Sequence, residues 1–112
     1  MAFNEYLQER IERVLNEKSI VYEARKMMGG LCFMIDDKMC VGIVKNDLMS
    51  RVGVDQYEEL LKRKGAREMD FSKRPMKGYV FVDPDGIDYE EYLEFWIEKC
   101  LEFNPKAKSS KK

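Results

Sequence analysis

Histidine is absent from the 112 residues of the chain. A Ser-His or Cys-His nucleophile pair is therefore impossible, and so is a zinc or non-haem iron site with imidazole ligands. The three cysteines form no Cys-x-x-Cys pair, so a cysteine zinc site would need a fourth ligand of another type. The sequence predicts a protein without metal or cofactor. An enzyme is the least favoured of three functional classes, because no pair of carboxylates is placed by the sequence in an apolar pocket.

Long apolar runs are also absent. No stretch approaches the roughly 20 apolar residues of a membrane span, and the N-terminus lacks the basic-then-apolar pattern of a signal peptide. An odd number of cysteines suits a reducing compartment better than a disulfide framework. We therefore expect a cytoplasmic protein that does not enter a membrane. With 45% hydrophobic residues the chain can build one core. We expect one domain over residues 1–104 and a disordered basic tail over residues 105–112.

Apolar periodicity and turn residues predict an α+β domain with a mostly antiparallel sheet, on which an N-terminal, a middle and a C-terminal helix pack. The expected helices cover residues 4–16, 55–65 and 88–103. The expected strands cover an extended segment from residue 21 to the first glycine pair, then 31–35, 39–44, 48–52, 67–71 and 79–82. The order along the chain is α-β-β-β-β-α-β-β-α.

Capping residues set the expected helix starts. Asn4 caps the first helix, and two capping boxes, Asp55 with Glu58 and Asp88 with Glu91, start the other two. The first helix turns Leu7, Ile11, Val14 and Leu15 toward the core, and we expect its charged residues, Arg10 among them, to face water. In the last helix the expected buried stripe runs from Tyr89 through Trp96 to Leu101.

The strands at 31–35 and 39–44 read as a hairpin around Asp36-Asp37, because Asp tolerates the left-handed conformation of a tight turn. Both strands are apolar on both faces, and seven of the eight methionines lie in or beside predicted sheet segments. Methionine is common where partners bind. We therefore predict a surface covered by a second copy of the chain, that is, a homodimer.

Charge is segregated along the chain although its net value is −1. Residues 62–77 carry seven cations against two acids, whereas residues 83–102 carry eight acids against one base. On the last helix Glu90, Glu94, Glu98 and Glu102 form an acidic row, which favours a basic partner. The tail adds four lysines from Lys106 onward. A solvated surface explains much of this charge, but a nucleic acid or a second copy of the chain is an alternative partner.

Two glycine joints stand where apolar strands begin: Lys26-Met27-Met28-Gly29-Gly30 and Arg74-Pro75-Met76-Lys77-Gly78. Neither is a phosphate loop, because the GxxxxGK[ST] pattern is missing and a strand rather than a helix follows the glycines. We interpret them as structural joints that present charged side chains. Gly29 and Gly30 are expected to serve folding, not chemistry.

The same two blocks carry a resemblance. The run Lys26–Met34 resembles the Met-Phe-Gly-Gly joint of the TfoX N-terminal domain family, with Met28 in place of the usual Phe. Lys38-Met39 after the hairpin turn, Arg74–Val82, and Trp96 in the last helix extend the likeness from about Phe3 to Leu101. The family is named for the TfoX (Sxy) regulator of bacterial natural competence. The resemblance implies a bacterial domain linked to transcriptional co-regulation of competence genes. Because the chain ends in a lysine tail, we expect a stand-alone N-terminal domain.

These observations favour a non-catalytic regulatory or protein-interaction module that forms a homodimer and meets another, unidentified protein. The alternative is a protein weakly associated with nucleic acid through the basic segment 62–77 and the lysine tail. The candidate interaction residues are Lys26, Met28, Gly29, Gly30, Lys62, Arg63, Lys64, Arg67, Lys73, Arg74, Met76 and Lys77.

Overall fold

The computed structural model describes residues 4–27, 30–68 and 77–107. The helices are α1 (Glu5–Glu17), the single turn α2 (Tyr57–Leu60) and α3 (Glu90–Phe103). The strands are β1 (Glu23–Met27), β2 (Gly30–Ile35), β3 (Lys38–Val44), β4 (Asp47–Arg51), β5 (Ala66–Glu68) and β6 (Tyr79–Val82). Short 3-10 helices cover Pro84–Gly86 and Asn104–Lys106. The predicted element order is confirmed.

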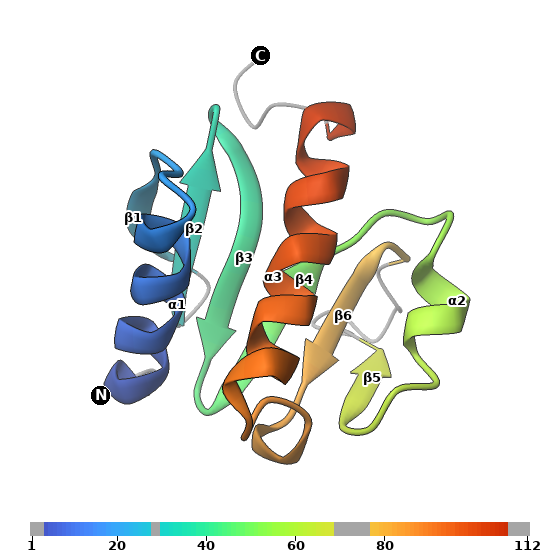
Figure 1. The fold of residues 1–112 in the computed structure, drawn as a ribbon. Helices are drawn as coiled ribbons and strands as arrows, with labels where there is room; N and C mark the ends of the chain where they lie inside the picture. Colours follow the sequence, from blue (N-terminus) through green and yellow to red (C-terminus); the bar gives the residue numbers. More distant parts are fainter. Residues whose placement is uncertain (1–3, 28–29, 69–76, 108–112) are drawn as a thin grey trace.

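The strands form one sheet in the order β1-β2-β3-β4-β6-β5, and each pairing between neighbours is antiparallel. Helices α1 and α3 lie on one face of this sheet, and α2 lies beside β5 and β6 at one end (Figure 1). The main core fills the space between the helices and the sheet, with Phe33, Ile43 and Trp96 among its fully buried side chains. The predicted α+β class is therefore confirmed.

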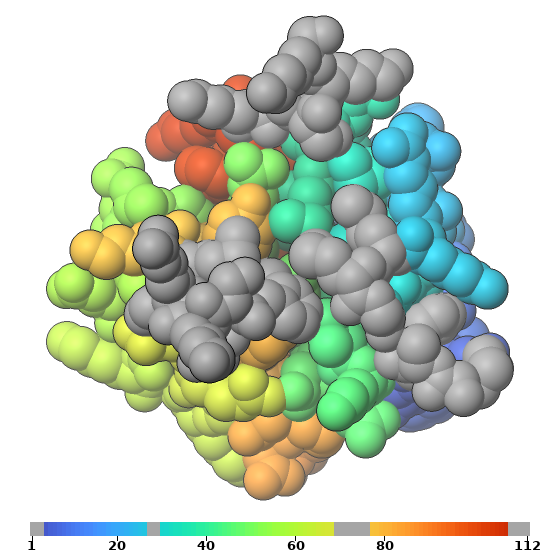
Figure 2. Space-filling view, turned by 180° about the vertical axis from the view of Figure 1, so that it is seen from behind, coloured from blue at the N-terminus to red at the C-terminus, as the bar shows by residue number. Residues whose placement is uncertain are grey.

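A second apolar cluster lies on the other face of the sheet. Cys32, Met34, Met49 and Phe81 form it, and they are only 1–7% exposed. Alternation along each strand produces both clusters, since Leu31 and Phe33 point to the helices while Cys32 and Met34 point away. Figure 2 views the molecule from this strand side. Both faces of the hairpin are buried in the single chain, and the predicted homodimer stays a prediction.

Helix α1 begins as its sequence predicts, because the Asn4 side chain accepts a hydrogen bond from the Leu7 backbone N–H at 3.1 Å. The expectation for Arg10 was wrong. Its side chain is buried, and its Nη2 donates to the Ile87 carbonyl oxygen at 2.6 Å. Arg10 lies on the polar flank of α1, which faces the segment just before α3. The apolar periodicity of a helix does not show which segment packs against its polar flank.

Both predicted capping boxes are wrong. Helix α2 starts after Gln56 and α3 after Tyr89, and neither N-cap side chain makes a capping hydrogen bond. Ile87 is 2% exposed and anchors the chain in the core, so the helix starts only at Glu90. Tyr89 is left outside the helix in an extended conformation and is 61% exposed, in contrast to its predicted burial.

The turns follow their residue chemistry. Asp36 and Asp37 both have positive φ, 55° and 63°, in the two-residue turn between β2 and β3, as predicted. After α3, the first residues of the predicted tail pack on the domain. Ala107 is 8% exposed, and Lys38 Nζ donates to the Pro105 carbonyl oxygen at 3.5 Å. Residues 108–112 lie outside the described part, so the disorder predicted for the tail stays a prediction.

Candidate functional site

Helix α3 pairs its acidic row with α1. Glu90 accepts from Arg10 Nε at 3.3 Å and from Arg13 Nη1 at 3.5 Å, and Glu98 accepts from Lys18 Nζ at 3.0 Å. The later residue of α3, Glu98, pairs with the later residue of the α1 side, Lys18, so α1 and α3 run parallel. We call this contact the seam. The sequence favoured a basic partner for the acidic row, and for these two glutamates the partner is α1 of the same chain.

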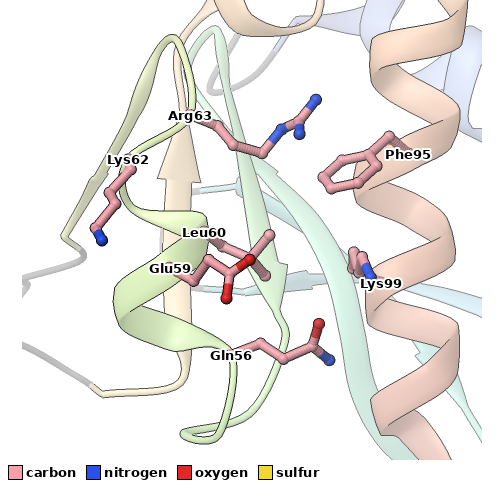
Figure 3. Close-up of a pocket in the computed structure, with 7 residues that line it drawn as sticks. All are labelled: Gln56, Glu59, Leu60, Lys62, Arg63, Phe95 and Lys99. Carbon is pink, nitrogen blue, oxygen red and sulfur yellow. The ribbon is translucent and has the colours of Figure 1, made fainter.

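The other flank of α3 is open toward α2 (Figure 3). A cavity of about 350 Å³ lies there between the two helices. A second cavity of about 270 Å³ lies next to it toward the start of α3. The residues that line the first are Gln56, Glu59, Leu60, Lys62, Arg63, Phe95 and Lys99. The residues that line the second are Arg63, Lys64, Gly86, Tyr92 and Trp96. Because Arg63 lines both, we treat them as one feature, the α2–α3 groove.

Arg63 and Phe95 meet across the groove, as Figure 3 shows. The guanidinium carbon of Arg63 lies 3.7 Å from the centroid of the Phe95 ring, and Lys99 Nζ lies 5.5 Å from the same centroid. The rings of Phe95 and Trp96 pack in a T-shaped arrangement, with centroids 5.7 Å apart. Cations over a ring face are attracted by its quadrupole. The ring therefore orients Arg63 without neutralising it.

The groove carries an excess of positive charge. Lys62, Arg63, Lys64 and Lys99 line it, against the single carboxylate of Glu59. Among the described residues, Lys62, Arg63 and Lys64 have no ion-pair partner, and Lys99 has only Glu102 at 3.7 Å. All three residues from Lys62 to Lys64 are exposed. Such an arrangement is suited to holding an anionic group near an apolar surface.

Backbone geometry fixes the cations in place. Gly65, just after Lys64, has φ of +79°, and a Cβ added there would meet the Asp83 carboxylate and the backbone of Gly86. Its carbonyl oxygen accepts a hydrogen bond from the Asp83 N–H at 3.0 Å. A Cβ on Gly86 would in turn meet the Lys64 carbonyl oxygen at 2.5 Å. Two glycines thus let the segment after α2 lie directly against the turn before α3.

The structure separates the predicted basic segment. It brings Lys62, Arg63 and Lys64 together at the groove. It places Arg67 on the other side of the sheet, where it pairs with Asp47 and lies 5.0 Å from the ring of Phe81. Lys77 is exposed just before β6 and lines neither cavity of the groove. Lys73, Arg74 and Met76 lie outside the described residues.

The glycine joint near residue 30 lies elsewhere. Lys26 is an exposed residue of β1, at the opposite margin of the sheet from β5. In β2, a Cβ on Gly30 would overlap the carbonyl oxygen of Ile43 in the neighbouring strand. Its φ is not positive, so close strand approach requires this glycine, which supports the structural role. Met28 and Gly29 lie outside the described part of the chain.

The groove residues that α3 contributes were not among those predicted from the sequence. Tyr92, Phe95 and Lys99 follow one another at i, i+3 and i+7 along one flank of α3, next to the buried stripe. That spacing was visible in the sequence. What it could not show is that α2 stops after one turn and leaves this flank open.

Chemical groups for catalysis are scarce in the described residues. No cluster of three or more potential metal ligands occurs in residues 4–27, 30–68 and 77–107. All three cysteines are buried. Burial raises the pKa of the Cys32 thiol to about 11, and burial next to Cys40 raises the pKa of Cys100 well above its usual value. Buried thiols of this kind are poor nucleophiles.

Comparisons with known proteins agree with the resemblance in the sequence. The family model described as the TfoX N-terminal domain matches residues 20–104, which is most of the chain. Neither the curated proteins nor the solved structures gave a match. Among the described residues, no helix is long and apolar enough to cross a membrane. The chain belongs to the TfoX N-terminal domain family.

Proposed function

We propose that this domain is a non-catalytic regulatory module that binds a protein partner through the α2–α3 groove. The observation that carries the proposal is the set of exposed cations at Lys62, Arg63 and Lys64, unpaired among the described residues beside the partly buried rings of Phe95 and Tyr92. Arginine and aromatic residues are enriched where proteins bind one another. The TfoX N-terminal domain family is not a family of enzymes. The family is linked to transcriptional regulation of competence, and this link supports a regulatory role for the complex of the domain with its partner.

A homodimer remains part of the proposal, with the free edge of β1 as the contact. Strand β1 pairs with β2 on one side and is the terminal strand of the sheet, and residues 23–26 are all exposed. Antiparallel pairing of two β1 strands in one register places Glu23 opposite Lys26 of the second copy, and the reverse. Opposite charges directly across two strands stabilise a pairing. Sedimentation at micromolar concentration should then give twice the 13.3 kDa mass of one chain. A species of 13.3 kDa alone would exclude this dimer.

Nucleic acid is the second candidate partner. The unpaired cations of the groove and the lysine tail favour it. The position of Arg67 on the other side of the sheet, and the exposed Glu58 and Glu59 on α2, weigh against a continuous phosphate-binding surface. Duplex binding by the tail alone should be weak and should fall steeply as salt rises, because counterions are released from the DNA. Titration of random duplex with and without residues 108–112 measures this.

A capture experiment tests the protein-interaction proposal. Tagged protein is incubated with cytoplasmic extract of the source cells, and captured proteins are identified by mass spectrometry. A variant with Lys62→Glu and Lys64→Glu reverses two groove charges, and Lys45→Glu is the control, because it reverses an exposed charge between β3 and β4, away from the groove and from β1. We expect a partner that is held by the wild type and by the control but lost by the groove variant. Equal capture by all three proteins would refute the role of the groove.

A further inference from the structure

The groove has three properties that together limit what it can bind: its charge, its apolar floor and its narrow size. The charge comes from four cations and one carboxylate, as described above. Lys62, Arg63 and Lys64 have no ion-pair partner among the described residues, so an incoming carboxylate would not have to displace one. An anionic ligand is therefore the complement of this surface.

The floor of the groove is apolar. Leu60 is 5% exposed, and Trp96, beneath the second cavity, is 1% exposed. Phe95 is half-buried on the α3 side. A cavity of about 350 Å³ is at the small end of ligand-binding pockets. It suits a single aromatic or aliphatic side chain rather than a folded surface.

The same details disfavour single-stranded nucleic acid. Proteins bind unpaired bases mainly by stacking them on exposed aromatic rings. Here the guanidinium of Arg63 lies over the Phe95 ring at 3.7 Å, and Trp96 is almost fully buried. Glu59 lines the groove, and its carboxylate interrupts the row of cations that a continuous run of phosphates would need.

Resting on the proposed function, we infer that the α2–α3 groove binds a short acidic segment of the partner protein. Its Asp and Glu side chains pair with Lys62, Arg63 and Lys64. One aromatic or aliphatic side chain of the segment enters the cavity beside Leu60 and Phe95. The cations orient the bound segment, and the side chain that enters the cavity anchors it, as is common at protein interfaces.

Direct titration tests the inference. The probe is a fluorescein-labelled synthetic peptide of Asp and Glu residues around one Trp, read by fluorescence anisotropy. Matched probes are the same peptide with Asn and Gln in place of the acids, and a labelled oligothymidylate. We expect the acidic peptide to bind and the amide peptide to bind at least about tenfold more weakly, since several charge contacts are lost. Amide chemical shifts should change at Leu60 and Phe95.

Variants locate the site. Lys62→Glu with Lys64→Glu should weaken the acidic peptide about tenfold, whereas Lys45→Glu, at an exposed position between β3 and β4, should change its affinity less than about twofold. Lys62 and Lys64 are exposed, so the fold should persist, and the melting temperature of each variant verifies this. No binding, tighter binding of oligothymidylate, or equal loss in the control would each overturn the inference. If capture of a partner still depends on the groove in that case, the proposed function stands and only the acidic chemistry fails.

Discussion

The charged residues beside the two flanks of α3 differ in whether they have ion-pair partners. On the seam side, Glu90 and Glu98 meet Arg10, Arg13 and Lys18 of α1. On the groove side, Lys62, Arg63 and Lys64 stand near the helix without an ion pair in the described structure. One flank of α3 thus meets charges that are satisfied within the chain, and the other faces three cations of the segment after α2 that have no partner among the described residues.

This difference separates two purposes of charge. The seam encloses Arg10, whose side chain is 11% exposed and holds both the Glu90 carboxylate and the Ile87 carbonyl. The Glu90 carboxylate is 42% exposed, so the costly contact to break is the buried hydrogen bond from Arg10 to the Ile87 carbonyl. The groove cations are exposed, and exposed charges contribute little to folding. Their concentration beside an apolar cavity is better explained by binding than by stability.

The largest loss of unfolding free energy should come from removing Arg10, the buried residue of the seam. Arg10→Ala leaves the Ile87 carbonyl without its donor and removes the closest cation of Glu90, and we expect a loss of about 3 kcal/mol of unfolding free energy. Urea denaturation followed by circular dichroism measures it. Arg13→Ala is the matched control, because its side chain is 55% exposed, and it should cost less than about 0.5 kcal/mol. Equal losses in both variants would show that Arg10 is not the centre of the seam.

Alkaline pH should lower the free energy of unfolding through groups other than Arg10 and Glu90. The pKa of the Cys32 thiol is 9.0 in the unfolded chain, where the thiol is solvated, and about 11 in the folded chain, where it is buried. Proton loss between these values stabilises the unfolded state, so stability present below about pH 9 falls as pH rises to about 11, by about 2–3 kcal/mol. The raised pKa values of Cys100, Tyr22 and Tyr57 act in the same direction.

Two variants identify the groups responsible for the alkaline loss. Cys32→Ala should have a flatter decline of unfolding free energy between about pH 9 and about pH 11 than the wild type, because its share of the titration is gone. Arg10→Ala should keep the wild-type slope, because Arg10 lies on α1 and Cys32 is buried on the other face of the sheet. A slope unchanged by Cys32→Ala would mean that this thiol is not the source.

A smaller effect is expected where the groove is attached to the core. Gly65→Ala forces a side chain into a φ of +79° and against the Asp83 carboxylate and Gly86. We expect a loss of about 1–2 kcal/mol. Because Lys62, Arg63 and Lys64 directly precede this residue, the variant should also weaken binding at the groove more than an equally destabilising change in the seam. Comparison with a seam variant of the same melting temperature separates the two contributions.

Local chemistry predicted much of the scaffold. The element order, the strand Tyr79–Val82, the Asn4 cap and the Asp36-Asp37 turn all follow from residues that act on their near neighbours. The capping box of α3 failed where Ile87, just before the helix, is buried in the main core among residues far away in sequence. Arg10 failed for the same reason, since its partner Ile87 is distant along the chain.

The candidate site was less predictable. Lys62, Arg63 and Lys64 could be named from the sequence as a basic run, and the structure keeps them together. Phe95 and Lys99 could not, because only the three-dimensional arrangement brings α3 next to the segment after α2. Arg67 shows the reverse case. It is close in sequence to Arg63, but β5 turns it to the other face of the sheet, beside Phe81.

The smallest expected effect tests the comparison most directly, by making the same charge reversal on each flank of α3. Lys18 Nζ lies 3.0 Å from the Glu98 carboxylate, so Lys18→Glu turns attraction into repulsion, and we expect a loss of about 0.5–1 kcal/mol. Lys62→Glu removes one of three adjacent like charges and should change stability by less than about 0.5 kcal/mol, in the stabilising direction. Paired urea titrations in low salt measure both, and added salt should bring the two variants together as the charges are screened. If Lys62→Glu were the more damaging change, Lys62 would be part of the folded structure's own ion pairs, and the contrast between the two flanks would be lost.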